Sequence, residues 1–330
     1  MFAAPAVAGD EILVGSCNGF FRAFDRESGR LKWAYDTRAD GAALEFHGEP
    51  WITPELAVVG SDLREDGATA YVYAFERTTG AARWKTPIQI GSISDGLSQG
   101  GDLWVLTMEG KLLDLELASG KIRWTLDTST TAPNLQFRTS NPASDGRRIF
   151  VAAADGNLRA VDARTGQTLW RRELGSRPMT SVLLHGGTLY VGTYDRQLFG
   201  ISADKGEVQF RLRLSEIPLS SLAFVDKRLI FFLGEKSVAA ADPALEKVLW
   251  KHDLASTLST AKPVVWRGSV LVGDESGEFR ALDPGDGQLR WSAHFPKMVR
   301  GIGVSDRTLY LGTLQGTLYA WSPPESRGSK

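Results

Sequence analysis

Residues 149–170 read IFVAAADGNLRAVDARTGQTLW, and the same pattern returns at residues 12–33 (ILVGSCNGFFRAFDRESGRLKW) and 270–291 (VLVGDESGEFRALDPGDGQLRW). Each copy contains an apolar run, a turn with Gly, a second apolar run that leads to Ala-x-Asp, another turn with Gly, and a final run that ends in Trp. A pattern of this length that returns along the chain indicates a protein built from internal repeats.

An aromatic residue closes each repeat, and two further positions keep a fixed offset from it. The position four residues earlier is Gly in six of seven repeats, and the position eight residues earlier is acidic in six of seven. An acidic side chain there is expected to accept backbone N–H bonds of the turn. We predict that these residues are structural anchors of the repeats. The aromatic anchors are Trp33, Trp84, Trp124, Trp170, Phe210, Trp250 and Trp291, and the acidic anchors are Asp25, Asp162, Asp242 and Asp283.

Short runs rich in Val, Ile, Leu, Phe and Tyr, bounded by Gly, Asp and Asn, predict β-strands, and no stretch shows a sustained helical period. About four strands in about 40 residues is the spacing of a β-propeller blade. We therefore predict an all-β, eight-bladed β-propeller with four-stranded antiparallel blades, the last lacking its outermost strand. The predicted domain spans 1–322, with a polar tail at 323–330. Its repeats lie near 3–36, 50–87, 91–127, 137–174, 179–214, 218–254, 260–295 and 299–322.

Ser- and Thr-rich segments precede five of the repeats. We expect these segments to form the innermost strands and to line a central channel, because small polar residues fit where blades converge. They are 92–98 (SISDGLS), 136–143 (QFRTSNPA), 179–184 (MTSVLL), 219–224 (LSSLAF) and 259–265 (STAKPVV).

Composition and charge exclude several classes of protein. Lys and Arg number 38 and Asp and Glu number 39, for a net charge of −1, which argues against a surface built to hold nucleic acid or anionic lipid. A hydrophobic share of 42% with 23% charged residues is typical of a folded globular protein. The apolar runs are too short to span a bilayer. We expect a monomer with protein partners.

The residues that commonly bind metals show no recognisable spacing. Cys17 is the only cysteine, which we take to exclude an internal disulfide, a CxxC pair and a cysteine-based zinc site. The four histidines, His47, His185, His252 and His294, show no pair at ligand spacing. Acidic residues in the insertion 61–70 do not follow the EF-hand pattern, so we expect a solvated loop there. We predict no metal, no cofactor and no catalytic residue.

The repeat resembles the PQQ-like propeller repeat, whose pattern AxDxxTGxxxW is seen as Ala160-x-Asp162-x-x-Thr165-Gly166-x-x-x-Trp170. The resemblance covers essentially the whole chain. It implies a propeller fold but is poorly specific for function, because the family includes quinoprotein dehydrogenases, assembly factors and sensor domains. Chain length and blade number are most similar to those of the BamB family of outer-membrane-protein assembly factors.

A second likeness to BamB proteins lies before the fourth repeat. That family carries a Leu-x-Leu-Arg stretch that contacts the POTRA region of the barrel-inserting subunit. The corresponding residues here are Leu135, Phe137 and Arg138, in which Leu and Arg match and Phe replaces the second Leu. The resemblance implies that these three residues bind a protein partner, although they would equally suit packing between blades. The family also has acidic residues in the next inter-blade loop, whereas this chain has Ser176, Arg177 and Pro178.

The resemblance also bears on the ends of the chain. In that family, a signal, a lipid-anchoring cysteine and a ring-closing strand come before the first blade. The chain here begins in a predicted innermost strand at 3–7. We therefore expect the missing strand of the last blade to lie before Met1, unless that blade closes with three strands. With an upstream signal the protein would be periplasmic and associated with the outer membrane, and with Met1 as its true start it would be cytoplasmic.

Three functions are compatible with this reading. The leading one is a non-catalytic scaffold that binds protein partners through its inter-blade loops. The second is a sensor or regulatory propeller that binds a small ligand in the central channel. The third, a quinoprotein enzyme, is disfavoured because the resemblance implies a disulfide between adjacent cysteines that a single cysteine cannot form.

Overall fold

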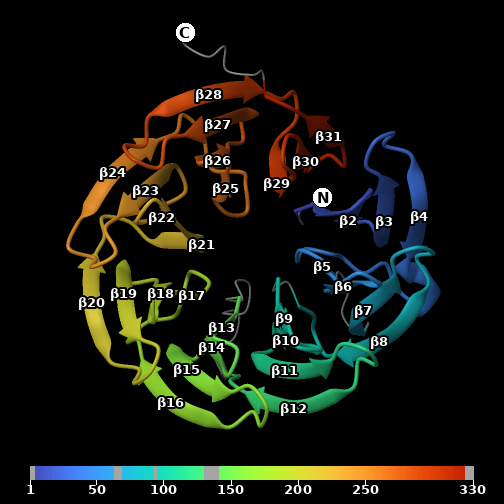
Figure 1. The fold of residues 1–330 in the computed structure, drawn as a ribbon, viewed down its shortest axis with the longest axis horizontal. Coiled ribbons are helices and arrows are strands. Elements are labelled where there is room, and N and C mark those ends of the chain that lie inside the picture. Colours follow the sequence, from blue (N-terminus) through green and yellow to red (C-terminus); the bar gives the residue numbers. More distant parts are fainter. Residues whose placement is uncertain (1–3, 63–68, 93–94, 130–140, 324–330) are drawn as a thin grey trace.

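The computed structural model describes residues 4–62, 69–92, 95–129 and 141–323. Within these residues, the strands β1 to β31 form eight antiparallel sheets arranged as blades around a central axis (Figure 1). Seven sheets have four strands and the last has three. The one helix in the described part is a 3-10 turn, η1 (Thr37–Asp40). The predicted all-β, eight-bladed propeller with an incomplete last blade is confirmed.

Strand order within each blade follows the sequence, from the innermost strand at the axis to the outermost strand at the circumference. Blade 1 contains β1 (Ala6–Ala8), β2 (Glu11–Gly15), β3 (Phe20–Asp25) and β4 (Leu31–Asp36); blade 2 contains β5 (Trp51–Ile52), β6 (Leu56–Gly60), β7 (Ala70–Glu76) and β8 (Ala82–Ile88). Blade 3 contains β9 (Leu97–Gln99), β10 (Asp102–Leu106), β11 (Lys111–Glu116) and β12 (Ile122–Asp127); blade 4 contains β13 (Ala143–Ser144), β14 (Arg148–Ala152), β15 (Asn157–Asp162) and β16 (Thr168–Glu173).

The second half of the ring repeats this arrangement. Blade 5 contains β17 (Leu183–His185), β18 (Thr188–Gly192), β19 (Gln197–Ser202) and β20 (Val208–Arg213); blade 6 contains β21 (Pro218–Val225), β22 (Arg228–Leu233), β23 (Ser237–Ala241) and β24 (Val248–Asp253). Blade 7 contains β25 (Val264–Trp266), β26 (Ser269–Gly273), β27 (Glu278–Leu282) and β28 (Leu289–His294); blade 8 contains β29 (Val299–Val304), β30 (Leu309–Thr313) and β31 (Leu318–Trp321).

The hydrophobic core lies between successive blades, because both faces of the second and third strands are covered. Between blades 4 and 5, for example, Phe150 and Leu158 pack with Leu189 and Phe199, and all four are almost fully buried. Burying a large apolar side chain stabilises a fold by about 1.5–3 kcal/mol. The ring is therefore held by many similar interfaces rather than by one central core.

The predicted aromatic anchors lie at these interfaces. Five of them donate the indole N–H to a backbone carbonyl oxygen of the next blade: Trp33 to Arg77 (2.6 Å), Trp84 to Leu117 (3.0 Å), Trp124 to Ala163 (3.1 Å), Trp170 to Ala203 (3.1 Å) and Trp250 to Pro284 (2.9 Å). Phe210 packs against the core between blades 5 and 6. Trp291 contacts Trp321 of blade 8, with ring centroids 5.4 Å apart.

The acidic anchors shape the turn that follows each third strand. In all four, one carboxylate oxygen accepts a backbone N–H of the turn: Asp25 from Ser28 (2.8 Å), Asp162 from Thr165 (2.8 Å), Asp242 from Lys247 (2.8 Å) and Asp283 from Gly285 (2.6 Å). In most repeats this turn carries a Gly of positive φ, and in five of them that Gly lies against the aromatic anchor of the preceding blade.

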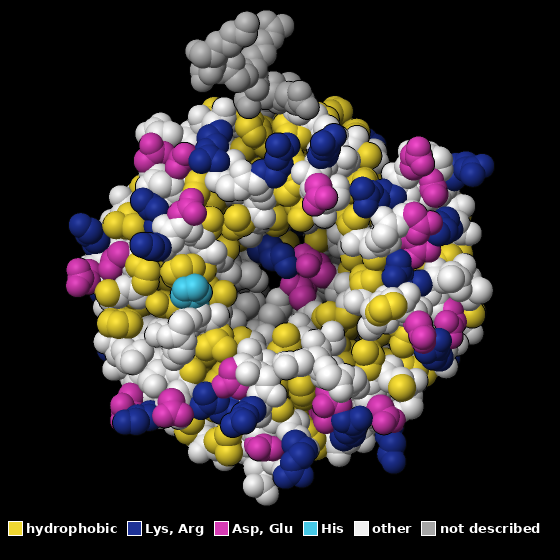
Figure 2. Space-filling model, in the orientation of Figure 1, with side chains coloured by type: hydrophobic (Ala, Val, Ile, Leu, Met, Phe, Trp, Pro, Cys, Tyr) yellow, Lys and Arg dark blue, Asp and Glu magenta, His cyan; other side chains and the backbone are white. Residues whose placement is uncertain are grey.

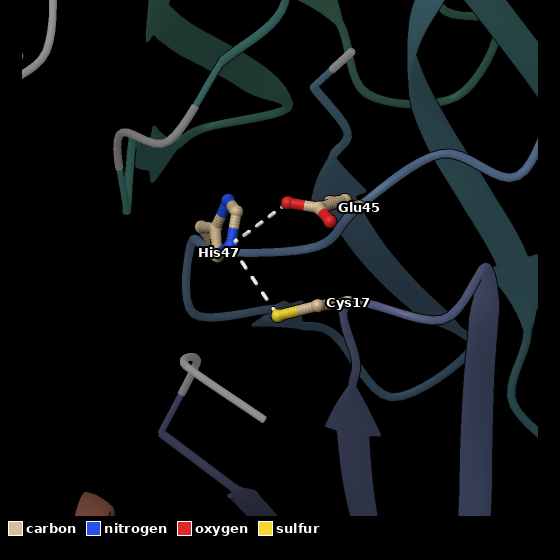
Figure 3. Close-up of side chains that lie close together, drawn as sticks. All are labelled: Cys17, Glu45 and His47. Carbon is tan, nitrogen blue, oxygen red and sulfur yellow. Dashed lines mark hydrogen bonds and ion pairs between the residues drawn. The ribbon is translucent and has the colours of Figure 1, made fainter. Parts of the chain in front are cut away.

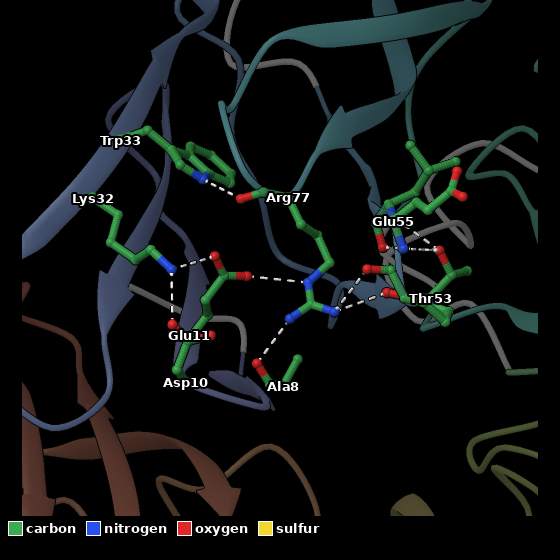
Figure 4. A network of polar contacts seen from close by, with 10 residues as sticks. Ala8, Asp10, Glu11, Lys32, Trp33, Thr53, Glu55 and Arg77 are labelled. Carbon is green, nitrogen blue, oxygen red and sulfur yellow. Dashed lines mark hydrogen bonds and ion pairs between the residues drawn. The ribbon is translucent and has the colours of Figure 1, made fainter.

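A polar network joins blades 1 and 2 (Figure 4). The buried Glu11 carboxylate pairs with Lys32 in its own blade at 2.7 Å and with Arg77 of blade 2 at 3.1 Å. Arg77 also donates to the carbonyl oxygens of Ala8 and Thr53. The carboxylate is only 3% exposed, so two cations and full hydrogen bonding offset its loss of hydration.

The innermost strands differ in how much of the predicted segments they contain. The strand β21 includes all of 219–224, whereas 179–184 contributes only its last two residues to β17, and of the described residues in 136–143 only Ala143 belongs to β13. Near the axis, hydroxyl groups form hydrogen bonds between blades. Ser181 Oγ lies 3.1 Å from Ser221 Oγ, and Ser259 Oγ donates to the Val299 carbonyl oxygen at 2.6 Å.

The ring is open at one place on its circumference. Among the described residues no fourth strand pairs with β31, and the outer wall is interrupted between β28 and β4 (Figure 1). A groove of about 540 Å³ lies between blades 8 and 1, and its lining includes Phe24, Tyr310 and Leu318. No helix in the described part of the chain is long and apolar enough to cross a membrane.

Candidate functional site

All connectors between blades lie on one face of the ring. Each connector leaves an outermost strand and enters the innermost strand of the next blade. Because the strands of a blade alternate in direction, each connector lies on the same side as the turns between second and third strands. We call this side the connector face. Loops carried by a rigid scaffold are common positions for binding residues, so this face is a candidate interaction surface.

A groove of about 990 Å³ lies on the connector face between blades 5 and 6. Its apolar residues include Met179, Ile217, Leu219 and Leu254. Its charged residues carry both signs and are Arg177, Arg196, Lys236, Lys251, Glu216, Glu235 and Asp253. A lining that combines apolar side chains with charges of both signs is typical of a protein interface rather than of a site for one charged small molecule.

Arg177 and Tyr194 stand at one end of this groove. The Arg177 guanidinium lies over the Tyr194 ring, 4.5 Å from its centroid. The backbone N–H of Tyr194 donates to the Arg177 carbonyl oxygen at 3.0 Å, which fixes the two residues relative to each other. Tyr194 is 50% exposed. Tyr and Arg are enriched among the residues that carry most of the binding energy of protein interfaces.

The predicted partner-binding residues Leu135, Phe137 and Arg138 lie outside the described residues. The neighbouring described residue, Asn141, shows where this connector leads. Its backbone N–H donates to Ser181 Oγ at 3.1 Å, and its carbonyl oxygen accepts the backbone N–H of Val182 at 3.3 Å. The connector therefore reaches the start of blade 5, close in sequence to Arg177.

Side chains bridge the central channel. Lys262, which precedes the innermost strand of blade 7, pairs with Asp95 of blade 3 at 3.2 Å and with Glu49 of blade 2 at 2.8 Å. Asp95 also accepts a hydrogen bond from Asn141 Nδ2 at 2.7 Å. Blades 3 and 7 face each other across an eight-bladed ring, so this contact spans the channel. Figure 2 shows basic and acidic side chains meeting at the centre of the ring.

The charged forms of Lys262 and its two carboxylate partners stabilise one another. Burial alone would lower the pKa of Lys262, but Asp95 and Glu49 outweigh that effect and raise it well above the ordinary range. Burial raises the pKa of the Glu49 carboxyl, and Lys262 opposes this shift. Lys262 therefore stays protonated at neutral pH, and its ion pairs bind residues from three blades together at the axis.

The structure brings together three side chains that could hold a metal ion, although their spacing along the chain indicates no such site. Metal-binding atoms of Cys17, Glu45 and His47 all lie within 4.8 Å of one another (Figure 3). Burial would lower the pKa of His47, but hydrogen bonds with Asp62 and Cys17 outweigh it and raise the pKa to about 10. The sequence gives no sign of this cluster, because Cys17 and His47 are separated by 30 positions and share no motif.

The acidic insertion adds one residue to this cluster. Asp62 contacts His47, whereas Glu65 and Asp66 lie outside the described residues. His185 stacks on Phe224, with ring centroids 3.6 Å apart, and His294 pairs with Glu278 at 3.0 Å. His185 and His294 thus have other partners, whereas His47 lies beside Cys17.

The sequence model of the family described as outer membrane protein assembly factor BamB matches residues 68–185 and 156–301. The chain belongs to the BamB family. It is 22% identical to the outer membrane protein assembly factor BamB of Yersinia pestis over 333 residues, covering 96% of this chain and 84% of that relative. It is 23% identical to BamB of Burkholderia pseudomallei, covering 97% of this chain and 84% of that relative.

Solved structures agree with this family. The crystal structure of BamB from Moraxella catarrhalis superposes with a TM-score of 0.80 and 25% identity, covering 97% of this chain and 96% of that chain. The C-terminal WD40 domain of Sif2 also superposes, with a TM-score of 0.78 but 10% identity, covering 98% of this chain and 95% of that chain. The second likeness shows the propeller fold alone.

Proposed function

We propose that this BamB-family chain is a non-catalytic scaffold that binds protein partners during outer-membrane protein assembly. The proposal rests on one structural contrast. The axis of the ring is crossed by the ion pairs of Lys262, whereas the connector face carries an open groove with apolar and charged lining. A binding partner therefore has an accessible surface at the connectors, whereas a group that enters the axis meets these ion pairs.

The proposed partner is the POTRA region of the barrel-inserting subunit, as the resemblance of Leu135, Phe137 and Arg138 to the BamB motif implies. The exposed Tyr194 and the Arg177 guanidinium stacked on it extend this surface into blade 5. Binding would dock and orient the partner without a covalent step. We place the protein at the periplasmic side of the outer membrane, in keeping with the names of its relatives.

The ion pairs across the axis argue against the sensor alternative. A small ligand at the level of Lys262 would have to displace these partly exposed ion pairs, which we expect to contribute about 1–3 kcal/mol to stability. The enzyme alternative lacks the adjacent cysteines of quinoprotein dehydrogenases, because Cys17 is the only cysteine. Both observations favour the scaffold.

Paired variants test which residues form the interface. We expect Phe137→Ala combined with Arg138→Ala, and separately Arg177→Ala combined with Tyr194→Ala, to weaken binding of a purified POTRA-domain fragment at least about tenfold by isothermal titration calorimetry. The melting temperature of each variant should stay close to that of the parent. The matched control is Leu169→Ala, which removes a 53%-exposed side chain from outer strand β16. If both pairs bind the fragment as tightly as the parent, the interface is assigned to the wrong face.

A further inference from the structure

Cys17, Glu45 and His47 come from two segments of the connector face beside the boundary of blades 1 and 2. Cys17 lies in the turn between β2 and β3, and the other two lie in the connector from β4 to β5 (Figure 3). His47 Nε2 lies 3.4 Å from Cys17 Sγ and 3.4 Å from Glu45 Oε2. All three side chains are partly buried, so each has already lost part of its hydration.

These separations suit a four-coordinate metal ion. Zinc binds thiolate sulfur, imidazole nitrogen and carboxylate oxygen at about 2.0–2.3 Å in tetrahedral geometry, which places neighbouring ligand atoms about 3.3–3.8 Å apart. Two of the three pairs already have this separation. The third pair, between sulfur and carboxylate, lies within 4.8 Å and needs to close by at most about 1 Å, which a change of side-chain torsion supplies.

Asp62 orients the imidazole ring. Its Oδ2 lies 2.5 Å from His47 Nδ1, which leaves Nε2 directed toward Cys17 and Glu45. Asp62 is 6% exposed, and its backbone exchanges two hydrogen bonds with Glu45, at 2.9 and 3.1 Å. Its Oδ1 is buried and has no hydrogen-bond partner among the described residues. A carboxylate on the far nitrogen of a metal-binding histidine is the usual arrangement in zinc sites, because it fixes the tautomer and raises ligand basicity.

We propose that Cys17, Glu45 and His47 form a binding site for one zinc ion, with Asp62 as the residue that positions His47. This site goes beyond the proposed scaffold function and does not depend on it. The mixture of a soft thiolate, an imidazole and a carboxylate favours zinc over magnesium and calcium, which prefer oxygen ligands alone. Three protein ligands leave the fourth position for water or for a group from a partner.

The same side chains also resemble a cysteine nucleophile with a histidine base and an orienting aspartate. In that arrangement the imidazole nitrogen that faces the sulfur serves as its base. The Glu45 carboxylate, however, lies as close to His47 Nε2 as the sulfur does, which serves a cation better than a nucleophile. The cluster therefore fits a metal better than a reacting thiol.

Binding of zinc and cobalt to the purified full chain, after treatment with a chelator, tests the site. We expect one equivalent of Zn²⁺ by isothermal titration calorimetry, and a near-ultraviolet thiolate-to-metal charge-transfer band when Co²⁺ is added instead. Cys17→Ser and His47→Gln should each weaken zinc binding at least about 100-fold and abolish the cobalt band or strongly reduce it. Asp62→Asn should retain the band but weaken zinc binding about 10- to 100-fold. The control His252→Gln, in outer strand β24 of blade 6, should bind zinc like the parent.

A measurement on the parent protein avoids any dependence on how the variants fold. Alkylation of Cys17 by iodoacetamide should be at least about tenfold slower with saturating Zn²⁺ than with chelator, because the metal holds the thiolate. An unchanged alkylation rate, the absence of saturable zinc binding, or zinc binding that persists in both Cys17→Ser and His47→Gln would each overturn the proposal.

Discussion

The ammonium nitrogen of Lys262 lies 3.2 Å from Oδ2 of Asp95, although the two residues belong to blades on opposite sides of the ring. Lys262 also pairs with Glu49 at 2.8 Å. A single cation thereby offsets the mutual repulsion of two carboxylates from neighbouring blades. This contact connects both halves of the ring at a point where the innermost strands are only two or three residues long.

Removal of this cation is expected to destabilise the ring. Because the three side chains are partly exposed, we expect Lys262→Ala to lower the free energy of unfolding by about 1–3 kcal/mol at pH 7, less than for a fully buried pair. Without Lys262, burial and Asp95 both raise the pKa of Glu49, so its protonated form is favoured in the folded state. The loss should therefore shrink as the pH falls toward 4.

Urea denaturation at pH 7 and pH 4 measures this difference. The matched control is Lys205→Ala in an exposed turn, which should change the free energy of unfolding by less than about 0.5 kcal/mol. A Lys262→Ala variant that is as stable as the parent at both pH values would contradict a stabilising role for the cluster.

Asp114 provides a second prediction, because it occupies a position at which the other blades carry a small residue. It lies opposite the anchor Trp124, where five other blades place Ala and one places Gly opposite their anchors: Ala23, Ala74, Ala160, Gly200, Ala240 and Ala281. Asp114 is 1% exposed, and its Oδ1 has no hydrogen-bond partner among the described residues. Burial raises the pKa of this carboxyl to about 6, with Asp102 adding to the shift.

Replacement of Asp114 should therefore stabilise the protein at neutral and higher pH. A carboxyl whose pKa is raised in the folded state stabilises that state only while it is protonated, and the contribution is lost as the pH rises through about 6. Since one pKa unit corresponds to about 1.4 kcal/mol, we expect Asp114→Ala to raise the free energy of unfolding at pH 8 by about 1–3 kcal/mol, with a smaller gain at pH 4. Denaturation of both proteins at pH 4 and 8 checks this, and a variant less stable than the parent at pH 8 would refute it.

Substitutions at two glycines can distinguish the effect of backbone conformation on stability from the effect of packing against an aromatic anchor. Gly287 and Gly29 hold the same position in the repeat, with φ of 72° and 68°. A Cβ on Gly287 would lie 2.6 Å from the Trp250 ring, whereas a Cβ on Gly29 would meet no atom within 4 Å. Gly29→Ala should lower the free energy of unfolding by about 1 kcal/mol, because of the positive φ alone. Gly287→Ala should lower it by about 2–4 kcal/mol, because the added Cβ also disturbs the packing of the Trp250 indole.

Guanidinium denaturation of these two variants tests whether the aromatic anchors hold neighbouring blades together. Equal losses for Gly287→Ala and Gly29→Ala would mean that contact with Trp250 contributes little to stability. Within the described residues, Gly29 is a fair control because its turn faces the open groove between blades 8 and 1.

The fold was predictable from the sequence because the residues that define each blade lie close together in the chain and recur in most repeats. The offsets between Asp162, Gly166 and Trp170 lie within one turn and one strand, and the same offsets recur in the other blades. Hydrogen bonding in the turn acts over that same short distance, and the indole N–H of Trp170 bonds to Ala203 in the next blade along the chain. The three-stranded last blade was predictable because the eighth repeat, 299–322, is shorter than the other seven.

The polar clusters were not predictable, because they depend on how the ring closes. Lys262 and Asp95 are 167 positions apart and meet only because eight blades place them on opposite sides of one narrow axis. Cys17 and His47 meet because a turn of blade 1 lies beside the connector to blade 2. Asp95 and Lys262 each stand two residues before the innermost strand of their blade, but this shared position does not show which blades meet. Cys17 and His47 share no motif.

The most direct test of the scaffold account is calorimetric titration of the purified full-length chain with the POTRA-domain fragment of the barrel-inserting subunit from the same organism. The account predicts saturable 1:1 binding that Arg177→Ala combined with Tyr194→Ala weakens at least about tenfold, while Lys205→Ala leaves it unchanged. The absence of saturable binding by the parent protein would contradict the account.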